Sequence, residues 1–201
     1  MAIQQDVPLA AQVLATIGTI CWCVQLLPQI WQNYRRGNCI AFPALTVFIW
    51  AISEVPFGAY VIVQDHAMAI QLQPQIFGVL CLVCWGQCLW LSGKCSKLWA
   101  TFWPFLLAAV MAVGQFLLIW TLRVGYPGRT MPIKVVWAFA AAGLVVGLIP
   151  QYVQQFKRQG RNLGFSWGFL AVDLAGALFS FLAMAVRKQF DVFGGTLYLI
   201  V

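Results

Sequence analysis

Charged residues are scarce in this sequence. Only 8% of its 201 residues are Asp, Glu, Lys or Arg, whereas 62% are hydrophobic. A soluble domain carries about 25% charged residues, so this chain cannot cover a folded domain with a water-compatible surface. The composition excludes a soluble globular protein and indicates a protein of the lipid bilayer.

Acidic residues and histidine are especially scarce, with five of the former and one of the latter. A hydrolytic triad cannot be assembled, because the single histidine, His66, falls in a loop. There is no phosphate-binding glycine-rich loop. Cys81, Cys84 and Cys88 have helical spacing but no histidine or carboxylate nearby, so we interpret them as packing residues. We expect no enzymatic activity, no metal and no cofactor.

Basic residues outnumber acidic ones and give a net charge of +7. Because they fall almost entirely between apolar runs, they predict topology and contact with anionic lipid rather than nucleic acid. The first apolar run has no Lys or Arg before it and Arg35 and Arg36 after it, which predicts a lumenal or extracellular N-terminus. The segment before that run is not basic, so we do not expect a signal peptide.

Long apolar runs predict helical membrane spans of about 20 residues. Six such spans are expected, at residues 9–32, 42–63, 67–91, 99–122, 133–156 and 165–186. A last apolar stretch, 192–201, has ten residues and is too short to cross as a helix. The expectation is a truncated form whose seventh helix is incomplete.

One short sequence occurs twice in matched surroundings. Leu26-Leu27-Pro28-Gln29-Ile30 ends the first apolar run, and Leu148-Ile149-Pro150-Gln151-Tyr152 ends the fifth, 122 residues later (150 − 28). A basic loop with a glycine follows each, and Phe42-Pro43 then corresponds to Phe165-Ser166 at an offset of 123. The pattern predicts an internal duplication.

The predicted organisation is all-helical. A first three-helix repeat occupies residues 1–92, a linker helix with its loops 93–132, and a second repeat 133–201, with its third helix incomplete. Three helices followed by one extra helix place the two repeats in the same orientation, as parallel repeats.

Each Pro-Gln pair interrupts a helix. Pro28 has no N–H for the carbonyl of Val24, and Pro150 has none for Val146. Membrane helices tolerate this where neighbouring groups satisfy the freed carbonyl, and Gln29 and Gln151 carry suitable donors. Two matched pairs favour hinges over static kinks in which the glutamine joins helices.

Two carboxyl groups lie inside predicted spans, Glu54 and Asp173. A charged carboxylate at mid-bilayer costs about 2.5–3.5 kcal/mol on insertion scales, and no Lys or Arg shares these spans. Protonation is the simplest remedy, so both are candidates for proton coupling, Asp173 more than Glu54. Trp50, Trp137 and Gly176 are candidates for lining a substrate cavity; a structural, protonated carboxyl remains the alternative.

The chain resembles the PQ-loop repeat family, which includes cystinosin and vacuolar basic amino-acid carriers, with SWEET-type sugar carriers and the KDEL receptor as structural relatives. The resemblance rests on Leu27-Pro28-Gln29 with Tyr34-Arg35-Arg36, and on Ile149-Pro150-Gln151 with Phe156-Lys157-Arg158. It implies seven helices in two three-helix bundles around a linker, and alternating access in vacuolar or lysosomal membranes. The stretch Asp173-Leu174-Ala175-Gly176 is similar to the cystinosin segment whose acidic residue takes up the coupling proton.

Two classes of function fit this sequence. The first is a proton-coupled transporter that exports a small solute, expected to be an amino acid, from an acidic organelle, with the bilayer, the solute and protons as its partners. The second is a receptor or assembly factor that uses the same scaffold without transport. Uncoupled sugar transport is a further alternative, which an unpaired Asp173 disfavours.

Overall fold

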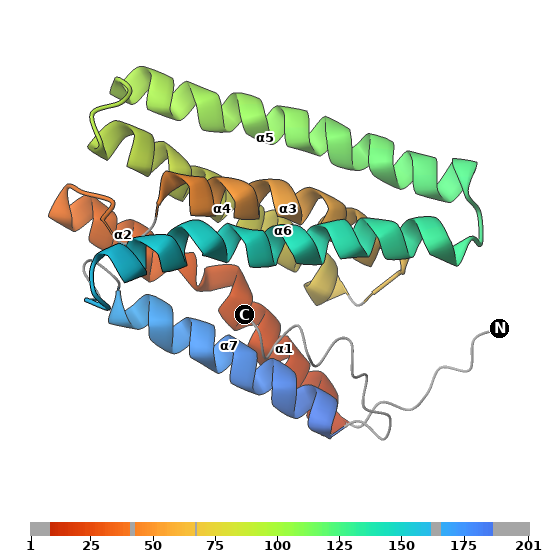
Figure 1. Ribbon diagram of the computed structural model, residues 1–201. Helices are drawn as coiled ribbons and strands as arrows, with labels where there is room; N and C mark the ends of the chain where they lie inside the picture. Colours follow the sequence, from red (N-terminus) through yellow and green to blue (C-terminus); the bar gives the residue numbers. More distant parts are fainter. Residues whose placement is uncertain (1–8, 41–42, 67, 162–165, 187–201) are drawn as a thin grey trace.

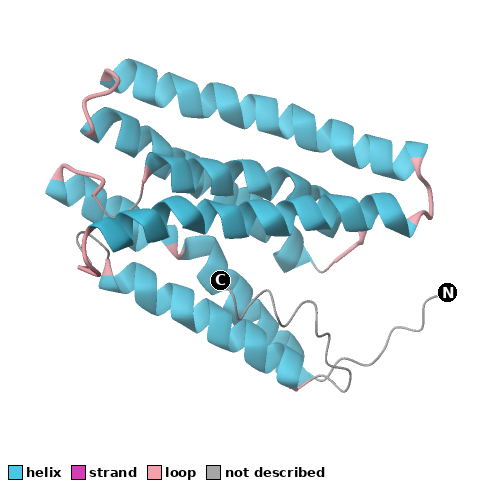
Figure 2. Ribbon diagram, in the orientation of Figure 1, coloured by secondary structure: helices cyan, strands magenta, loops and turns pink. Residues whose placement is uncertain are grey.

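The computed structural model describes residues 9–40, 43–66, 68–161 and 166–186, and these residues form helices and loops without strands (Figures 1 and 2). The expected stretch 192–201 lies outside them. The predicted all-helical class is confirmed, with helix bounds close to the predicted spans. The elements are α1 (Leu9–Val24), α2 (Leu26–Arg36), α3 (Ala44–Val63), α4 (Met68–Leu91), α5 (Lys97–Trp120), a π-helical turn η1 (Thr121–Gly125), α6 (Thr130–Lys157) and α7 (Trp167–Ala185).

Five helical segments of the described chain are long and apolar enough to cross a membrane. Two of the five include an adjoining element: α1 continues into α2, and α5 continues into η1. The shorter α7 has 19 residues, about 28 Å at 1.5 Å per residue, close to the ~30 Å hydrocarbon core of a bilayer. The protein is therefore a multi-pass membrane protein.

The first span is interrupted between α1 and α2, at Gln25. Pro28 lies three residues later and cannot donate to the carbonyl of Val24, which gives a physical reason for a break at this place. Pro150 lies inside α6, and that helix continues through it to Lys157. The two Pro-Gln pairs thus have different effects on their helices.

Two helix pairs form most of the contacts between the N-terminal and C-terminal parts of the bundle, and α2 also contacts α7. α1 packs on α7, and α3 packs on α6, while α3 and α4 also pack on each other and on α5. Figure 1 shows α5 along one edge and α1 with α7 along the opposite edge, and it shows α1–α2 and α6 running in the same direction. We call these contacts the α1–α7 interface and the α3–α6 interface.

The two interfaces are built from equivalent positions. A Cβ on Gly176 of α7 would lie 3.3 Å from Cys21 Cβ of α1, and a Cβ on Gly143 of α6 would meet the Ser53 hydroxyl of α3. Gly143 follows Cys21 by 122 residues and Gly176 follows Ser53 by 123. At each interface, a glycine of one helix meets a small side chain of the other, so the sequence duplication is also a duplication of contacts.

Gly18 allows the close approach of α1 and α7. A Cβ there would lie 2.5 Å from Ser180 Oγ and 3.3 Å from the Gly176 carbonyl oxygen, and Ser180 Oγ already accepts a hydrogen bond from Trp22 Nε1. Gly114 of α5 has open space around it. We expect Gly114→Ala to raise the free energy of unfolding by about 0.5–1 kcal/mol through helix propensity, whereas Gly18→Ala should lower it by about 1–3 kcal/mol through overpacking.

Denaturant titration of the helical circular dichroism signal in detergent measures both glycine variants. An equal gain from the two substitutions would show that α1 and α7 do not pack as closely as described.

Candidate solute-binding cavity

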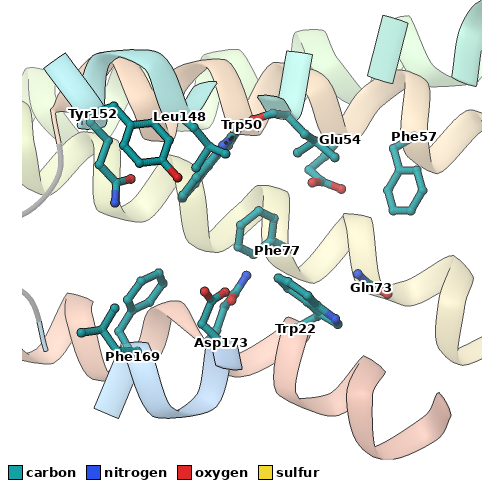
Figure 3. A pocket seen from close by; sticks show the side chains of 14 residues that line it. Trp22, Trp50, Glu54, Phe57, Gln73, Phe77, Leu148, Tyr152, Phe169 and Asp173 are labelled. Carbon is teal, nitrogen blue, oxygen red and sulfur yellow. Dashed lines mark hydrogen bonds between the residues drawn. The ribbon is translucent and has the colours of Figure 1, made fainter. Parts of the chain in front are cut away.

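A cavity of about 170 Å³ lies between the two interfaces (Figure 3). The α3–α6 pair borders it on one side and α1 with α7 on the other, and α4 also contributes lining residues. Its walls are mainly aromatic and aliphatic, with a few polar side chains among them. The lining residues are Trp22, Gln25, Trp50, Glu54, Phe57, Gln73, Phe77, Leu144, Leu148, Gln151, Tyr152, Phe169, Leu170 and Asp173.

Both intramembrane carboxyl groups line this cavity. Figure 3 shows Glu54 extending from α3 and Asp173 from α7 toward the same space. Glu54 is 5% exposed, and α4 passes close to it at Gly78, where a Cβ would lie 3.3 Å from Glu54 Cβ. Among the described residues, an ion pair forms on the surface between Arg123 and Asp65. Neither Glu54 nor Asp173 takes part in it.

The aromatic walls are held in place by their own contacts. Trp50 Nε1 donates to the Leu144 carbonyl oxygen at 3.1 Å, and Trp22 Nε1 donates to Ser180 Oγ at 3.2 Å. Gly147 makes room for Trp50, since a Cβ there would lie 2.5 Å from its Cδ1. Both indole N–H groups therefore donate to protein acceptors, and the rings supply apolar surface to the cavity.

The first Pro-Gln pair joins α2 to the start of α7. Gln29 is fully buried; its Oε1 accepts from the Ser166 backbone N–H at 2.8 Å, and its Nε2 donates to Asn33 Oδ1 at 2.8 Å. Asn33 Nδ2 in turn donates to Cys84 Sγ of α4 at 3.7 Å. This chain of hydrogen bonds connects α2 to the start of α7 and to α4.

Among the residues that the structure describes, the second Pro-Gln pair has no such link. Gln151 Oε1 is buried without a hydrogen-bond partner among the described residues, and Gln151 lines the cavity. At the offset of 123, the counterpart of Ser166 is Pro43, which has no backbone N–H. At the α3–α6 interface, Arg158 Nη1 instead donates to the Ile40 carbonyl oxygen at 2.9 Å, in an exposed position.

Gln25 is a lining residue that the sequence analysis did not identify. It is 3% exposed, it lies at the break between α1 and α2, and its Oε1 has no hydrogen-bond partner in the described part of the chain. An amide in an apolar run, three residues before Pro28, was the available signal. Trp137 and Gly176, proposed from the sequence as cavity residues, are not among the lining residues, whereas Trp50 is.

These features define a class: a multi-pass helical membrane protein with two equivalent inter-repeat interfaces and a small cavity between them. A family model for the PQ loop repeat matches residues 10–69 and 133–199. The chain belongs to the PQ-loop repeat family, as the two Pro-Gln pairs predicted.

Two fungal proteins are similar to this chain over most of its length. An uncharacterized membrane protein of Saccharomyces cerevisiae, YDR090C, is 35% identical over 199 residues, which cover 96% of this chain and 62% of that protein. An uncharacterized protein of Schizosaccharomyces pombe, C2E12.03c, is 32% identical over 184 residues, which cover 87% of this chain and 62% of that protein. The chain thus spans less than two thirds of the length of the curated relatives it matches.

Proposed function

We propose that this protein transports a small solute across an organellar membrane by proton-coupled alternating access. The observation that carries the proposal is the cavity between the two inter-repeat interfaces, into which Glu54 and Asp173 project. Carboxyl groups inside a membrane bundle that lack a basic partner mark proton or solute pathways in membrane proteins. Asp173 is the proposed proton-coupling residue and Glu54 the second candidate.

Alternating access needs two arrangements of the same helices around a fixed site. The Pro-Gln pairs lie toward the same end of the bundle, one in each repeat, and Pro28 and Pro150 are the proposed hinges. Residues 93–132 connect the two repeats in this proposal. Opening at the Pro-Gln end would separate α2 from α7, or α6 from α3, and would expose the cavity on that side.

The transport proposal is tested by solute counterflow in proteoliposomes that contain the purified chain. A panel of small solutes, with amino acids first, is trapped inside, and uptake of the labelled solute is followed with and without a pH gradient. We expect exchange of at least one solute and faster exchange when a proton gradient is imposed. Uptake equal to that of protein-free liposomes, for every solute and at every gradient, would contradict the proposal.

The alternative is a receptor or assembly factor that uses the same scaffold. Co-purification of a partner protein without transport of any solute would favour it. For the location, we propose a vacuolar or lysosomal membrane with the N-terminus in the lumen. Protease accessibility of a tag at residue 1 in sealed organelles tests this orientation.

A further inference from the structure

The cavity is rich in hydrogen-bond acceptors and poor in charged donors. Two carboxyl groups line it, whereas no Lys, Arg or His occurs among its described lining residues. The two indole N–H groups donate to Leu144 and Ser180 of the protein. The remaining donors are neutral: the amides of Gln25, Gln73 and Gln151 and the Tyr152 hydroxyl.

Two of the acceptors in the cavity have no hydrogen-bond partner among the described residues. The Oε1 atoms of Gln25 and Gln151 are both buried without a hydrogen bond to any described residue. A buried acceptor without a donor destabilises the folded protein, so such groups point to a ligand or to water that satisfies them. Gln25 is the stronger case, because its side chain is almost completely buried, with 3% exposed.

We infer that the cavity binds a protonated amine that carries no carboxylate. An ammonium group offers N–H donors to the Gln25 and Gln151 carbonyl oxygens and a positive charge to Glu54 and Asp173. A cation is also attracted to the face of an aromatic ring, more strongly in a desolvated site than in an exposed one. The carboxylate of an amino acid would instead stand beside two acidic side chains without a basic partner.

The size of the cavity limits the amine. A cavity of about 150 Å³ accommodates benzene, and this one measures about 170 Å³. The complementary ligand is therefore a small amine with a compact apolar part that fits between Trp22, Trp50 and Phe77. The inference deepens the proposed function, because it assumes that the same cavity receives the cargo.

The amine and protons compete for the same two carboxyl groups, so binding of one should weaken binding of the other. Amine affinity should therefore rise as the pH rises. The titratable groups that face these two from the helices packed against α3 and α7 are thiols and a phenol. They are Cys23 of α1 and Cys81 of α4 near Glu54, Cys21 of α1 beside Gly176, and Tyr152 of α6 across the cavity.

Benzylamine and three molecules of similar shape test the inference on the unmodified 201-residue chain in detergent. Benzyl alcohol lacks the charge, phenylglycine adds a carboxylate, and benzyltrimethylammonium keeps the charge but has no N–H. Equilibrium dialysis should show benzylamine binding at least about tenfold more tightly than each of the others, a difference of about 1.4 kcal/mol. Equal or tighter binding of benzyl alcohol or phenylglycine, or no benzylamine binding, overturns the inference.

Variants assign the binding to this cavity. Asp173→Asn and Glu54→Gln should each weaken benzylamine binding about tenfold or more, whereas Asp65→Asn, the same chemical change at an exposed carboxyl, should not. Gln25→Leu should reduce the preference for benzylamine over benzyltrimethylammonium. If benzylamine binds but no solute is transported, the proposed function fails alone; if another solute is transported and benzylamine does not bind, only this inference fails.

Discussion

Asp173→Asn should abolish the stimulation of transport by a pH gradient. Asparagine has nearly the shape of aspartic acid but cannot take up or release the proton. A charged carboxylate at mid-bilayer costs about 2.5–3.5 kcal/mol, a factor of about 100 in an equilibrium constant, so a step that depends on its neutralisation is strongly driven by protons. We expect the gradient-dependent part of solute counterflow to fall at least about tenfold.

Two matched variants make the Asp173 result interpretable. Asp65→Asn changes a carboxyl that pairs with Arg123 on the surface and should leave the pH stimulation intact. Glu54→Gln changes the second carboxyl of the cavity and should leave a larger part of the stimulation than Asp173→Asn. If stimulation survives in Asp173→Asn and disappears in Glu54→Gln, the coupling residue is Glu54.

Gln29→Leu should destabilise the protein strongly, and Gln151→Leu should not, although the two glutamines are equivalent in the sequence. Gln29 accepts from the Ser166 N–H and donates to Asn33. Leucine would leave both partners buried and unpaired, at about 1–3 kcal/mol for each group. At Gln151 the substitution removes a buried carbonyl oxygen that has no partner among the described residues.

The comparison requires the free energy of unfolding in detergent for both leucine variants, from denaturant titrations of helical circular dichroism. We expect a loss of about 2–3 kcal/mol for Gln29→Leu and a change within about 0.5 kcal/mol, or a gain, for Gln151→Leu. A further variant, Pro43→Ser, restores a backbone N–H at the position equivalent to Ser166. This substitution should raise the free energy of unfolding when residue 151 is glutamine and leave it unchanged in a Gln151→Leu background.

Much of the helical arrangement was predictable because each span carries its signal locally. Continuous apolar runs of sufficient length predicted α3 to α7 within a few residues, and the repeated Pro-Gln pair predicted the two repeats. Which helices pack on each other was harder to predict. A membrane helix is apolar on all sides, so its sequence does not show which face meets a neighbour, and the α1–α7 and α3–α6 pairs became evident only from the structure.

The candidate site was predictable in part. Glu54 and Asp173 stood out because a carboxyl inside an apolar run is rare. The depth of Trp50 in its span suggested the cavity, but the same reasoning pointed to Trp137, which does not line it. Gln25 was missed because a single amide in a span is commonly a link between helices. Its missing partner is a property of the packed structure alone.

Pro43 has no backbone N–H to donate, unlike its counterpart Ser166, and this difference makes the two interfaces mechanically unequal. At one interface, the buried Gln29 side chain accepts a hydrogen bond from the Ser166 N–H and is held by Asn33 of its own helix. At the other, the hydrogen bond at the same end is the exposed one from Arg158 to Ile40. Water and salt compete with an exposed bond far more than with a buried one. We therefore expect the contact of α1–α2 with α7 to stay closed while the α3–α6 contact opens, so that the two duplicated interfaces have unequal roles.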